Sequence, residues 1–394
     1  MAFDTPDSYF TARLEDYTAL RHDIHQHPET AFEEVRTSNL LAEKLESFGL
    51  EVHRGLAGTG LVAKLSYGTS DRAIGLRADM DALHMDEMND FAHASQVPGK
   101  MHGCGHDGHS VMLLAAAEYL SQHEVFDGTV YFIFQPAEEN EGGGRVMVEE
   151  GLFDKFPMEA VFGMHNIPGI PLGHFALKTG PLMAGYDRFE IVLTGKGGHA
   201  GIPHQAINPL PVAGELAGAL QSIVPQTVNP LNATVLSLTK INGGHTFNVI
   251  PETVTIGGTV RYLNALDRDK IRQQIRKRVA GIADAHNVEF SLDYEEGYPP
   301  TINEAVETAN CTKVLQDTFG EDAVWTNPEP LMGSEDFAFM LNEKPGCYIW
   351  AGNGETGPHS CMIHNPRYDF NDDLLPIGAL YWAKLAEARL PKSV

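Results

Sequence analysis

The stretch GTVYFIFQPAEE, residues 128–139, is typical of a buried strand that ends beside a ligand site. A hydrophobic run of strand-forming residues leads into a proline turn, and Glu138 and Glu139 follow that turn directly. In an open parallel sheet, ligands bind in the crevice beyond the carboxyl ends of the strands. Taken alone, two acids after a turn are more typical of a solvated loop. The choice between these interpretations depends on how the neighbouring strands end.

Two other predicted strands also end in polar side chains. The strand predicted at 72–80 runs into Asp79 and Asp81, and the strand predicted at 160–164 runs into His165. Helices are predicted at 10–24, 33–48 and 107–123, and a further strand at 60–67. Strands that alternate with helices indicate an α/β fold with a mainly parallel sheet covered on both faces. Three strand ends that supply Asp, Glu and His favour a metal site at one edge of that sheet.

The order of the predicted elements changes at about residue 186. Strands and helices are then predicted in the order β-α-β-β-α-β, at 187–194, 204–224, 233–240, 253–262, 267–286 and 288–294. This is the order of a ferredoxin-like unit. The earlier pattern resumes at 304–319, 347–351 and 374–388. We therefore predict a parallel-sheet domain, residues 1–184 and 298–394, interrupted by an inserted α+β domain at residues 185–297.

Residues 99–109, GKMHGCGHDGH, form the segment that is richest in chemically active side chains. Three His, one Cys and one Asp stand among four Gly at the start of a predicted helix. Glycine lets the backbone adopt a positive φ and approach a site closely. Cys104 and His106 are two residues apart, so they can direct a thiolate and an imidazole to one ion. The alternative is a buried Cys followed by His and Asp side chains that cap the helix.

Two further segments present histidine on a turn. In HSCMIHNPRY, residues 359–368, His364 precedes an Asn-Pro turn that would hold it rigidly. His359 and Cys361 are nearby rivals, and spacing does not choose among the three. In GKGGHAGIPH, residues 195–204, the inserted domain presents His199 on a glycine-rich turn. This turn either caps a helix, which the residues alone favour, or presents His199 to a cleft in the other domain.

Together these segments resemble the dinuclear metallopeptidase superfamily that includes aminoacylase and carboxypeptidase G. Within it, the chain is similar to the amidohydrolase branch of hippurate hydrolase, N-acyl-L-amino acid amidohydrolase and the indole-3-acetyl-amino-acid hydrolases. The resemblance covers nearly the whole chain and includes RADMDAL at 77–83, GSEDF at 333–337 and YDFND at 368–372. It implies a metallohydrolase domain with an inserted ferredoxin-like domain that serves as a lid and in dimerisation.

The resemblance also implies a role for each matching position. The positions that match the family's metal ligands are Cys104, His106, Glu139, His165 and His364. Glu138 matches the general base, and Asp81 matches an Asp that supports the ligands from behind. His199 matches the lid histidine that polarises the scissile carbonyl, often in the partner subunit. Asn248 and Arg261 match positions where the lid binds polar groups of the substrate.

These roles imply a metal-dependent amidohydrolase that cleaves N-acyl amino acids such as hippurate. The cofactor would be a divalent metal, two ions per subunit, zinc or manganese. Metal-bound water would be the nucleophile, since no Gly-x-Ser-x-Gly motif offers another. The wider superfamily bridges its metals with an Asp where this chain has His106, so the Cys104 sulfur or a hydroxide would form the bridge. The alternatives are a dipeptidase or carboxypeptidase on the same core, and a metal-binding protein without activity, against which Glu138 argues.

Composition limits the partners and the compartment. Asp and Glu outnumber Lys and Arg by 53 to 28, a net charge of −25, whereas nucleic acids and anionic membranes need a basic surface. The longest strictly apolar run, 111–117, is too short to cross a bilayer. The four cysteines show no disulfide spacing and the first residues are acidic, so we expect a cytoplasmic protein. The resemblance implies a small-molecule substrate and a homodimer or larger homo-oligomer.

Overall fold

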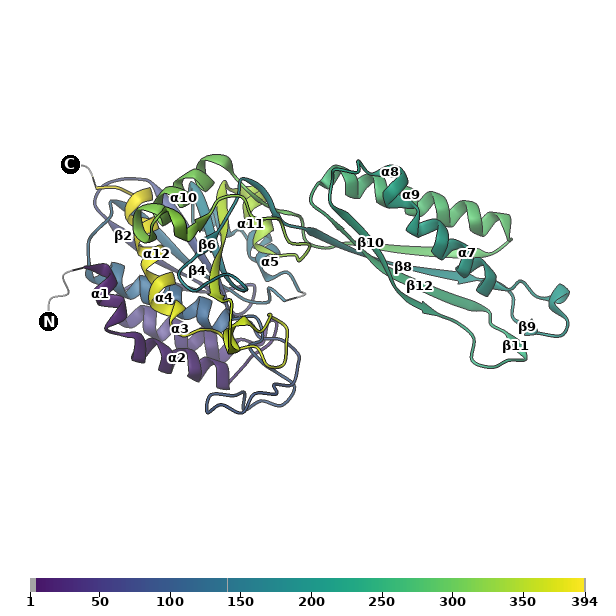
Figure 1. The fold of residues 1–394 in the computed structure, drawn as a ribbon, viewed down its shortest axis with the longest axis horizontal. Helices are drawn as coiled ribbons and strands as arrows, with labels where there is room; N and C mark the ends of the chain where they lie inside the picture. Colours follow the sequence, from purple (N-terminus) through teal and green to yellow (C-terminus); the bar gives the residue numbers. More distant parts are fainter. Residues whose placement is uncertain (1–4, 140, 393–394) are drawn as a thin grey trace. The chain divides into compact units, whose positions relative to one another are not determined.

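The computed structural model describes residues 5–139 and 141–392, which fold as two units (Figure 1). The first unit comprises the chain up to residue 182, residues 302–329 and the chain from residue 336 onward. The second unit comprises residues 183–301 and 330–335. The domain limits predicted from the sequence, 1–184, 185–297 and 298–394, stay a prediction, and they do not separate 330–335 from its neighbours.

An eight-stranded sheet forms the centre of the first unit. Its strands are β1 (Glu51–Leu56), β2 (Gly60–Tyr67), β3 (Ala73–Asp79), β4 (Gly128–Gln135), β5 (Ala160–Pro168), β6 (Phe175–Ala176), β15 (Val324–Trp325) and β16 (Gly346–Gly354). The strand order is β1-β2-β4-β3-β5-β16-β6-β15. Strands β4, β3, β5 and β16 run parallel to one another, while β1 and β2 form an antiparallel edge. Every residue of β3 and β5 is buried, so both faces of this part of the sheet are covered, and the predicted mainly parallel α/β fold is confirmed.

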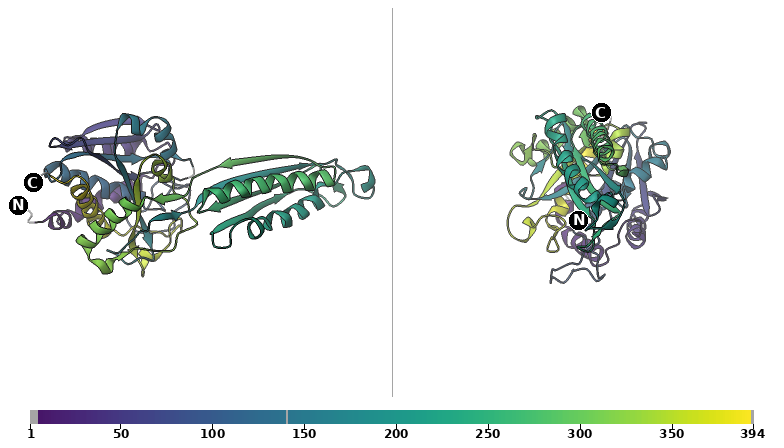
Figure 2. Two further views of the ribbon diagram at one scale, coloured as in Figure 1. Left: turned by 90° about the horizontal axis from the view of Figure 1, so that it is seen from above. Right: turned by 90° about the vertical axis from the view of Figure 1, so that its right-hand side faces the viewer.

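Helices cover this sheet (Figures 1 and 2). They are α1 (Pro6–Thr11), α2 (Leu14–Gln26), α3 (Val35–Ser47), α4 (His106–Gln122), α5 (Gly143–Glu149), α6 (Leu152–Lys155), α10 (Ala305–Phe319), α11 (Phe337–Glu343) and α12 (Leu374–Arg389). Short elements are η2 (Glu321–Ala323), η3 (Pro358–Ser360) and the paired strands β7 (Gly180–Met183) and β14 (Thr301–Asn303). Helix α4 is buried from His106 through Ala117, because its apolar side chains face the core all round. It thereby holds its N-terminus firmly at the edge of the sheet.

The helix predicted at 10–24 and the strand predicted at 160–164 differ from the structure. The single helix predicted at 10–24 is two helices, because the chain leaves helical geometry at Arg13. The strand predicted to end at Met164 continues to Pro168, because β16 pairs with it along that length and places Trp350 opposite His165. His165 therefore lies inside a buried strand rather than after its end.

The second unit has the predicted β-α-β-β-α-β order. Its strands are β8 (Gly185–Thr194), β10 (Thr234–Asn242), β12 (Thr253–Tyr262) and β13 (Glu289–Glu296), and its helices are α7 (Pro209–Gln221), α8 (Ile223–Thr227) and α9 (Ala265–Ala285). The strands form an antiparallel sheet of order β10-β12-β8-β13, with the helices on one face (Figure 2). Along β8, Asp187, Phe189, Ile191 and Leu193 are buried and alternate with more exposed residues. This order confirms the predicted ferredoxin-like arrangement.

The start of the helix predicted at 204–224 is wrong. Residues Pro203–Gln205 form a single 3₁₀ turn, η1, and α7 begins only at Pro209. The Asn208 side chain accepts a hydrogen bond from the N–H of Leu210 at 3.1 Å, and proline follows at the first helical position. Before that turn lies β9 (Gly198–His199), which pairs with β11 (Val249–Ile250). Among the described residues, no helix is both long and apolar enough to cross a membrane.

Candidate metal centre

Strand ends and turns of the first unit bring the five predicted metal ligands together. The ligand atoms of Cys104, His106 and His165 lie within 4.8 Å of one another. Those of Cys104, Glu139 and His364 form a second set within the same limit. Cys104 belongs to both sets, so the five side chains gather around its sulfur atom. This gathering joins segments of the chain that are up to 260 residues apart, from Cys104 to His364.

Cys104 and His106 are positioned by the tight turn that begins α4. Gly105, the residue between them, has φ 96°, a left-handed conformation that glycine adopts without strain. A side chain at Gly105 would collide with Asn166 and with the Tyr368 hydroxyl. Only glycine therefore allows this turn to pack against the end of β5, which explains the glycine-rich spacing of the motif.

The ring of His106 is oriented by Asp81. Its Nδ1 lies 2.9 Å from the Asp81 carbonyl oxygen and 3.2 Å from Asp81 Oδ1. Both partners are acceptors, so Nδ1 donates, and Nε2 is the nitrogen left for another partner. Nε2 is buried and has no hydrogen-bond partner. A histidine whose one nitrogen is held by a carboxylate while the other stays available is the usual arrangement at metal sites.

His165 and Glu139 present their remaining ligand atoms in the same way. His165 Nδ1 donates to the Asn166 carbonyl oxygen at 2.6 Å, and its Nε2 lies 3.3 Å from Cys104 Sγ. The N–H of Glu139 donates to Asp81 Oδ2 at 3.0 Å, so Asp81 supports Glu139 as well as His106. Glu139 Oε1 is buried without a hydrogen bond of normal geometry. Buried polar atoms are rarely left this way unless something binds them.

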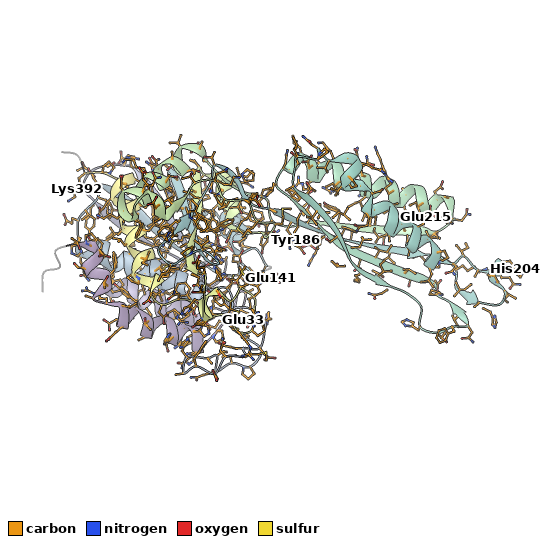
Figure 3. The ribbon with its side chains drawn as sticks, viewed as in Figure 1. Glu33, Glu141, Tyr186, His204, Glu215 and Lys392 are labelled. Atoms are coloured by element: carbon orange, nitrogen blue, oxygen red, sulfur yellow. The ribbon has the colours of Figure 1, made fainter. Side chains whose placement is uncertain are left out.

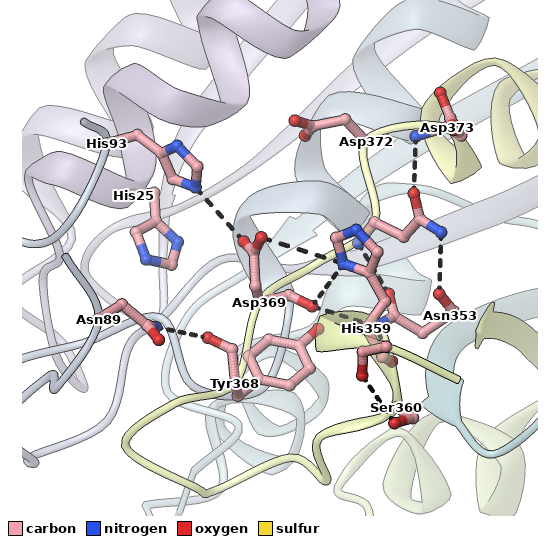
Figure 4. A network of polar contacts seen from close by, with 12 residues as sticks. His25, Asn89, His93, Asn353, His359, Ser360, Tyr368, Asp369, Asp372 and Asp373 are labelled. Carbon is pink, nitrogen blue, oxygen red and sulfur yellow. Dashed lines mark hydrogen bonds and ion pairs between the residues drawn. The ribbon is translucent and has the colours of Figure 1, made fainter. Parts of the chain in front are cut away.

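Of the three rivals in the late loop, only His364 joins the cluster. Its Nε2 lies 2.9 Å from Glu139 Oε1, and its N–H donates to the Gly103 carbonyl oxygen at 2.7 Å. It has φ 63°, a left-handed conformation that is uncommon for a residue with a side chain. His359 instead faces Asp369 (Figure 4), and Cys361 belongs to no ligand set among the described residues.

A polar network fixes the segment that follows His364 (Figure 4). His93 Nε2 lies 3.3 Å from Asp369 Oδ1, and the Asn89 side chain donates to the Tyr368 carbonyl oxygen at 3.0 Å. These contacts join the late loop to a segment far from it in the sequence. The position of His364 is therefore supported on its C-terminal side as well as by its own N–H.

His25 of α2 lies in the same network and is fully buried. Its Nδ1 lies 2.8 Å from Asp107 Oδ2 and its Nε2 lies 3.3 Å from Glu87 Oε1. Both partners are carboxylates, so both ring nitrogens donate. Burial lowers the pKa of His25, but the hydrogen bonds to Asp107 and Glu87 outweigh burial and raise this pKa to about 9. The two carboxylates therefore favour the protonated imidazole at this buried position.

Glu138 lies next to the ligands and is also buried. Its ligand oxygen lies within 4.8 Å of those offered by His106 and Glu139, and the N–H of Asp336 donates to Glu138 Oε1 at 3.4 Å. The preceding residue, Ala137, has φ 54°, so the chain turns sharply just before Glu138. This turn directs two consecutive carboxylates to one place.

Asp79, the other acid at the end of β3, belongs to the support of the cluster. Arg77 donates to its Oδ2 at 2.7 Å, and His109 Nδ1 lies 2.6 Å from its Oδ1. Asp79 Oδ2 lies 3.7 Å from His106 Nε2, too far for a hydrogen bond. The structure thus separates the two acids that end this strand, since Asp81 contacts His106 Nδ1 whereas Asp79 is neutralised by Arg77.

The electrostatics of the cluster suit a cation. Burial raises the pKa of the Cys104 thiol well above its ordinary value, and Glu139 and Glu138 raise it further. Burial lowers the pKa of His106, but nearby carboxylates, Asp79 first, outweigh burial and raise it to about 10. Surplus negative charge therefore causes the His106 shift and adds to the effect of burial at Cys104, and a divalent ion would balance that charge. Thiolate and imidazole are good zinc donors and carboxylates also suit manganese, so the residues present fit a divalent metal centre.

The second unit holds the other three predicted site residues, and it brings only two of them together. His199 on β9 is exposed and pairs with Val249, while the N–H of Ala200 donates to the Asn248 carbonyl oxygen at 3.0 Å. Arg261 lies at the opposite end of β12 from the turn that carries Asn248. Figure 3 labels one residue at each end, Tyr186 and His204. The Tyr186 ring lies 4.9 Å from the Arg261 guanidinium, and His204 lies near His199.

Arg261 is held by its own part of the second unit. Its Nη1 donates to the Met332 carbonyl oxygen at 2.8 Å and to Ser334 Oγ at 3.2 Å. Met332 and Ser334 belong to the short segment 330–335 that groups with this unit. Arg261 and Asn248 of one chain are therefore not a common binding site within the unit, although the resemblance assigns both to substrate.

An α/β sheet that gathers thiol, imidazole and carboxylate ligands beside a buried glutamate defines the class of metal-dependent hydrolases. Residues 75–388 match the family described as Peptidase family M20/M25/M40. The hippurate hydrolase of Campylobacter jejuni is 42% identical over 94% of this chain and 96% of its own, and IAA-amino acid hydrolase ILR1-like 2 of Arabidopsis thaliana is 38% identical over 93% and 83%. A Bacillus subtilis structure, described as a dinuclear metal-binding peptidase from the M20 family, has a TM-score of 0.83 at 32% identity and covers 96% of this chain and 99% of that one.

This chain belongs to Peptidase family M20/M25/M40. The predicted family resemblance is confirmed, and so is the prediction of an amidohydrolase that depends on divalent metal.

Proposed function

We propose that this protein hydrolyses N-acyl amino acids to a carboxylic acid and a free amino acid, with hippurate as the first substrate to test. The observation that carries the proposal is the position of the buried Glu138 beside five converging ligand side chains. Relatives named hippurate hydrolase and IAA-amino acid hydrolase support acylated amino acids as the substrate class.

Cys104, His106, Glu139, His165 and His364 would hold the metal. Two ligand sets share Cys104, which supports two divalent ions, and the donors suit zinc or manganese. When bound, such ions polarise an amide carbonyl and lower the pKa of water, which is the chemistry that amide hydrolysis lacks at neutral pH. Asp81 would keep His106 in the tautomer that can bind an ion.

Glu138 would act as the general base. Its carboxylate would take a proton from the attacking water and then give that proton to the amine that leaves. A base must stay out of the metal's own coordination to keep its proton affinity, and Glu138 is set apart from Glu139 by the hydrogen bond from the Asp336 N–H. Burial of Glu138 would also favour transfer of the same proton from water to the leaving amine, because bulk water would not exchange with it.

His199 would polarise the scissile carbonyl. The N–H of Gly201 donates to His199 Nδ1 at 2.9 Å, so the ring proton lies on Nε2, which is a hydrogen-bond donor. Asn248 lies on the neighbouring turn and would bind a polar group of the substrate. Arg261 offers further guanidinium N–H groups to a carboxylate at the other end of the unit. Because these groups share no site within one unit, contributions from two subunits are part of the proposal.

We therefore also propose a homodimer joined through the second unit. β10 is an edge strand on which Val235 and Ile241 are exposed. On the neighbouring α7, a Cβ atom added to Gly214 or Gly218 would meet nothing within 4 Å. An unpaired strand edge beside a helix of small exposed residues lets another backbone approach closely. Light scattering at assay concentration tests this, and a monomer with full activity contradicts it.

We place the protein in the cytoplasm, because Cys104 must stay reduced to bind metal. All four cysteines are free. The acidic composition supports a small-molecule substrate rather than nucleic acid or a membrane surface as the partner.

The test is a panel of hippurate, hippuramide, N-acetyl amino acids and free dipeptides, assayed with zinc or manganese and with a chelator. We expect chelator-sensitive cleavage of the acylated amino acids and weaker cleavage of hippuramide, which lacks the carboxylate. Cleavage of dipeptides without cleavage of any acylated amino acid overturns the proposal in favour of a metallo-dipeptidase. Loss of metal without loss of hydrolysis overturns the metal-dependent mechanism.

A further inference from the structure

We infer that Glu34 is a positioning residue, which holds the turn that carries the general base Glu138. The inference rests on the proposed function, since it assumes that Glu138 acts as the base. Glu34 lies just before α3, far from Glu138 in the sequence, and its side chain is fully buried. Its Oε1 accepts the N–H of Ala137, the residue immediately before Glu138, at 2.9 Å.

The turn at Ala137 needs such support. Ala137 has φ 54°, and its side chain is fully buried. A residue with a Cβ atom in this conformation is strained, and it persists only where its surroundings hold it. The Ala137 carbonyl oxygen accepts the N–H of Gly143 at 2.9 Å, so Glu34 and Gly143 together satisfy both backbone groups. Without Glu34, a buried N–H next to the base would have no acceptor.

Glu34 is itself fixed from two directions. Its Oε1 also accepts the N–H of Phe32 at 3.1 Å, and its Oε2 accepts the hydroxyl proton of Thr59 at 2.7 Å. Phe32 is another residue with a positive φ, 61°, so the loop before α3 is constrained on its own account. The carboxylate thus joins this loop, the turn between β1 and β2, and the turn after β4.

The same loop reaches the end of β3. The Glu29 carbonyl oxygen accepts the N–H of Ala82, which follows Asp81, at 2.8 Å. The Glu29 carboxylate in turn accepts the N–H groups of Arg36 and Thr37 at 2.9 and 2.8 Å, at the start of α3. One loop therefore contacts the backbone beside Asp81 and the backbone beside Glu138, the two strand ends that the proposed mechanism uses.

A hydrogen-bonding role makes a specific prediction for the conservative variant. In Glu34→Gln, the amide oxygen can accept from Ala137 and Phe32, and the amide N–H can donate to the Thr59 hydroxyl oxygen. Burial raises the pKa of Glu34 to about 7, so the neutral carboxyl group is already accessible at neutral pH. A glutamine should therefore replace Glu34, whereas an alanine should not.

The experiment compares Glu34→Ala, Glu34→Gln and the control Glu150→Ala in the metal-loaded protein. Glu150 accepts the N–H of Ala57 at 2.7 Å, and Ala57 also has a positive φ, 50°, but no proposed ligand or base follows it. We expect Glu34→Ala to lower kcat about 10–100-fold with unchanged KM and metal content. Glu34→Gln and the control should keep parental kcat. Parental kcat in Glu34→Ala, or an equal loss in Glu34→Gln, overturns the inference.

A second variant serves if Glu34→Ala does not fold. Thr59→Val removes only the hydroxyl that orients Oε2, so we expect a smaller loss of kcat, about 2–5-fold, with unchanged KM and metal content. Parental kcat in that variant overturns the inference. Failure of the proposed function is recognised separately, because then Glu138→Gln keeps its activity. If Glu138→Gln is inactive and Glu34→Ala is fully active, only the positioning role is wrong.

Discussion

The candidate site histidines of the two units differ in burial and in hydrogen bonding. In the first, His106 is fully buried, one nitrogen is held by Asp81, and the other has no hydrogen-bond partner. In the second, His199 is exposed, and its Nδ1 accepts a hydrogen bond from the N–H of Gly201, two residues away. The ligand side chains of the first unit are thus held in place by the protein itself. Such preorganisation is a main source of catalytic effect in active sites. The second unit offers His199 Nε2 as an exposed hydrogen-bond donor, and a binding site around it would need groups from outside this unit.

The largest effect should come from the preorganised unit. Glu138→Gln should retain metal and lose about 10²–10⁴-fold in kcat, the usual contribution of a general base. Metal analysis and steady-state kinetics on one preparation measure both quantities. Glu139→Gln is the matched neighbour, and it should lose metal as well as activity. If Glu138→Gln is the variant that loses metal, the roles of the two glutamates are exchanged.

His199→Ala tests the exposed histidine of the second unit as the group that polarises the scissile carbonyl. We expect a loss of about 10²–10³-fold in kcat, as for removal of one donor to an oxyanion, with metal content and melting temperature unchanged. His204→Ala is the control, because His204 is also exposed and lies five residues further along the same turn. Parental kcat in His199→Ala would return this residue to a role in the turn alone.

The buried contacts of His25 in the first unit should make the free energy of unfolding depend on pH. The pKa of His25, raised to about 9 by Asp107 and Glu87 against the effect of burial, exceeds the value near 6.5 of an unfolded chain. The stabilisation is therefore complete below about pH 6.5 and disappears as the pH rises through about 9. Denaturation at several pH values should show a loss of about 3 kcal/mol over this window. His25→Gln should remove that slope, and an unchanged slope contradicts the assignment.

Asp81→Asn weakens the orientation of a ligand without removing one. We expect metal affinity to fall about 10–100-fold, because partners behind a metal-binding histidine have that effect. Titration against a competing chelator gives the affinity, and kcat at saturating metal should stay close to the parental value. Unchanged affinity would show that His106 needs no support from Asp81.

The smallest effect should come from the exposed loop of the second unit. Phe247 is fully exposed, so Phe247→Ser should change the free energy of unfolding of an isolated chain by less than about 0.5 kcal/mol. Denaturant unfolding measures this. A larger loss of stability that depends on protein concentration would mean that Phe247 is covered in an assembly, which would sharpen the contrast between the units.

The sequence predicted the parts of the fold whose signal is local. β2 and β12 begin and end where predicted, because turn residues bound each uninterrupted strand pattern. The observed end of β5 has no local signal, since only pairing with β16 extends this strand to Pro168. The helix predicted from 204 failed because a 3₁₀ turn and the Asn208 cap displace the start of α7.

The candidate site divides in the same way. The five ligand candidates could be named because their motifs resemble those of the family, whereas spacing alone does not choose His364 among its rivals. Glu34 could not, since its partner Ala137 is 103 residues away and no periodicity connects the two. The resemblance grouped Asn248 with Arg261 by role, whereas the structure places them at opposite ends of β12. Long-range hydrogen bonds and strand ends are properties of the assembled sheet, which a linear pattern does not contain.

The neighbour of β5 has a consequence for how the protein is made. One edge of β5 pairs with β3, but its other partner, β16, begins only at Gly346, whereas β5 ends at Pro168. At about 5–20 residues per second, a ribosome needs roughly 10–35 s to translate the chain from the end of β5 to β16. All four strands of the second unit's main sheet are synthesised in that interval, so this unit can fold while the apolar edge of β5 is still unpaired. During that interval the unpaired edge of β5 is open to pairing with another chain, a hazard that chaperones limit.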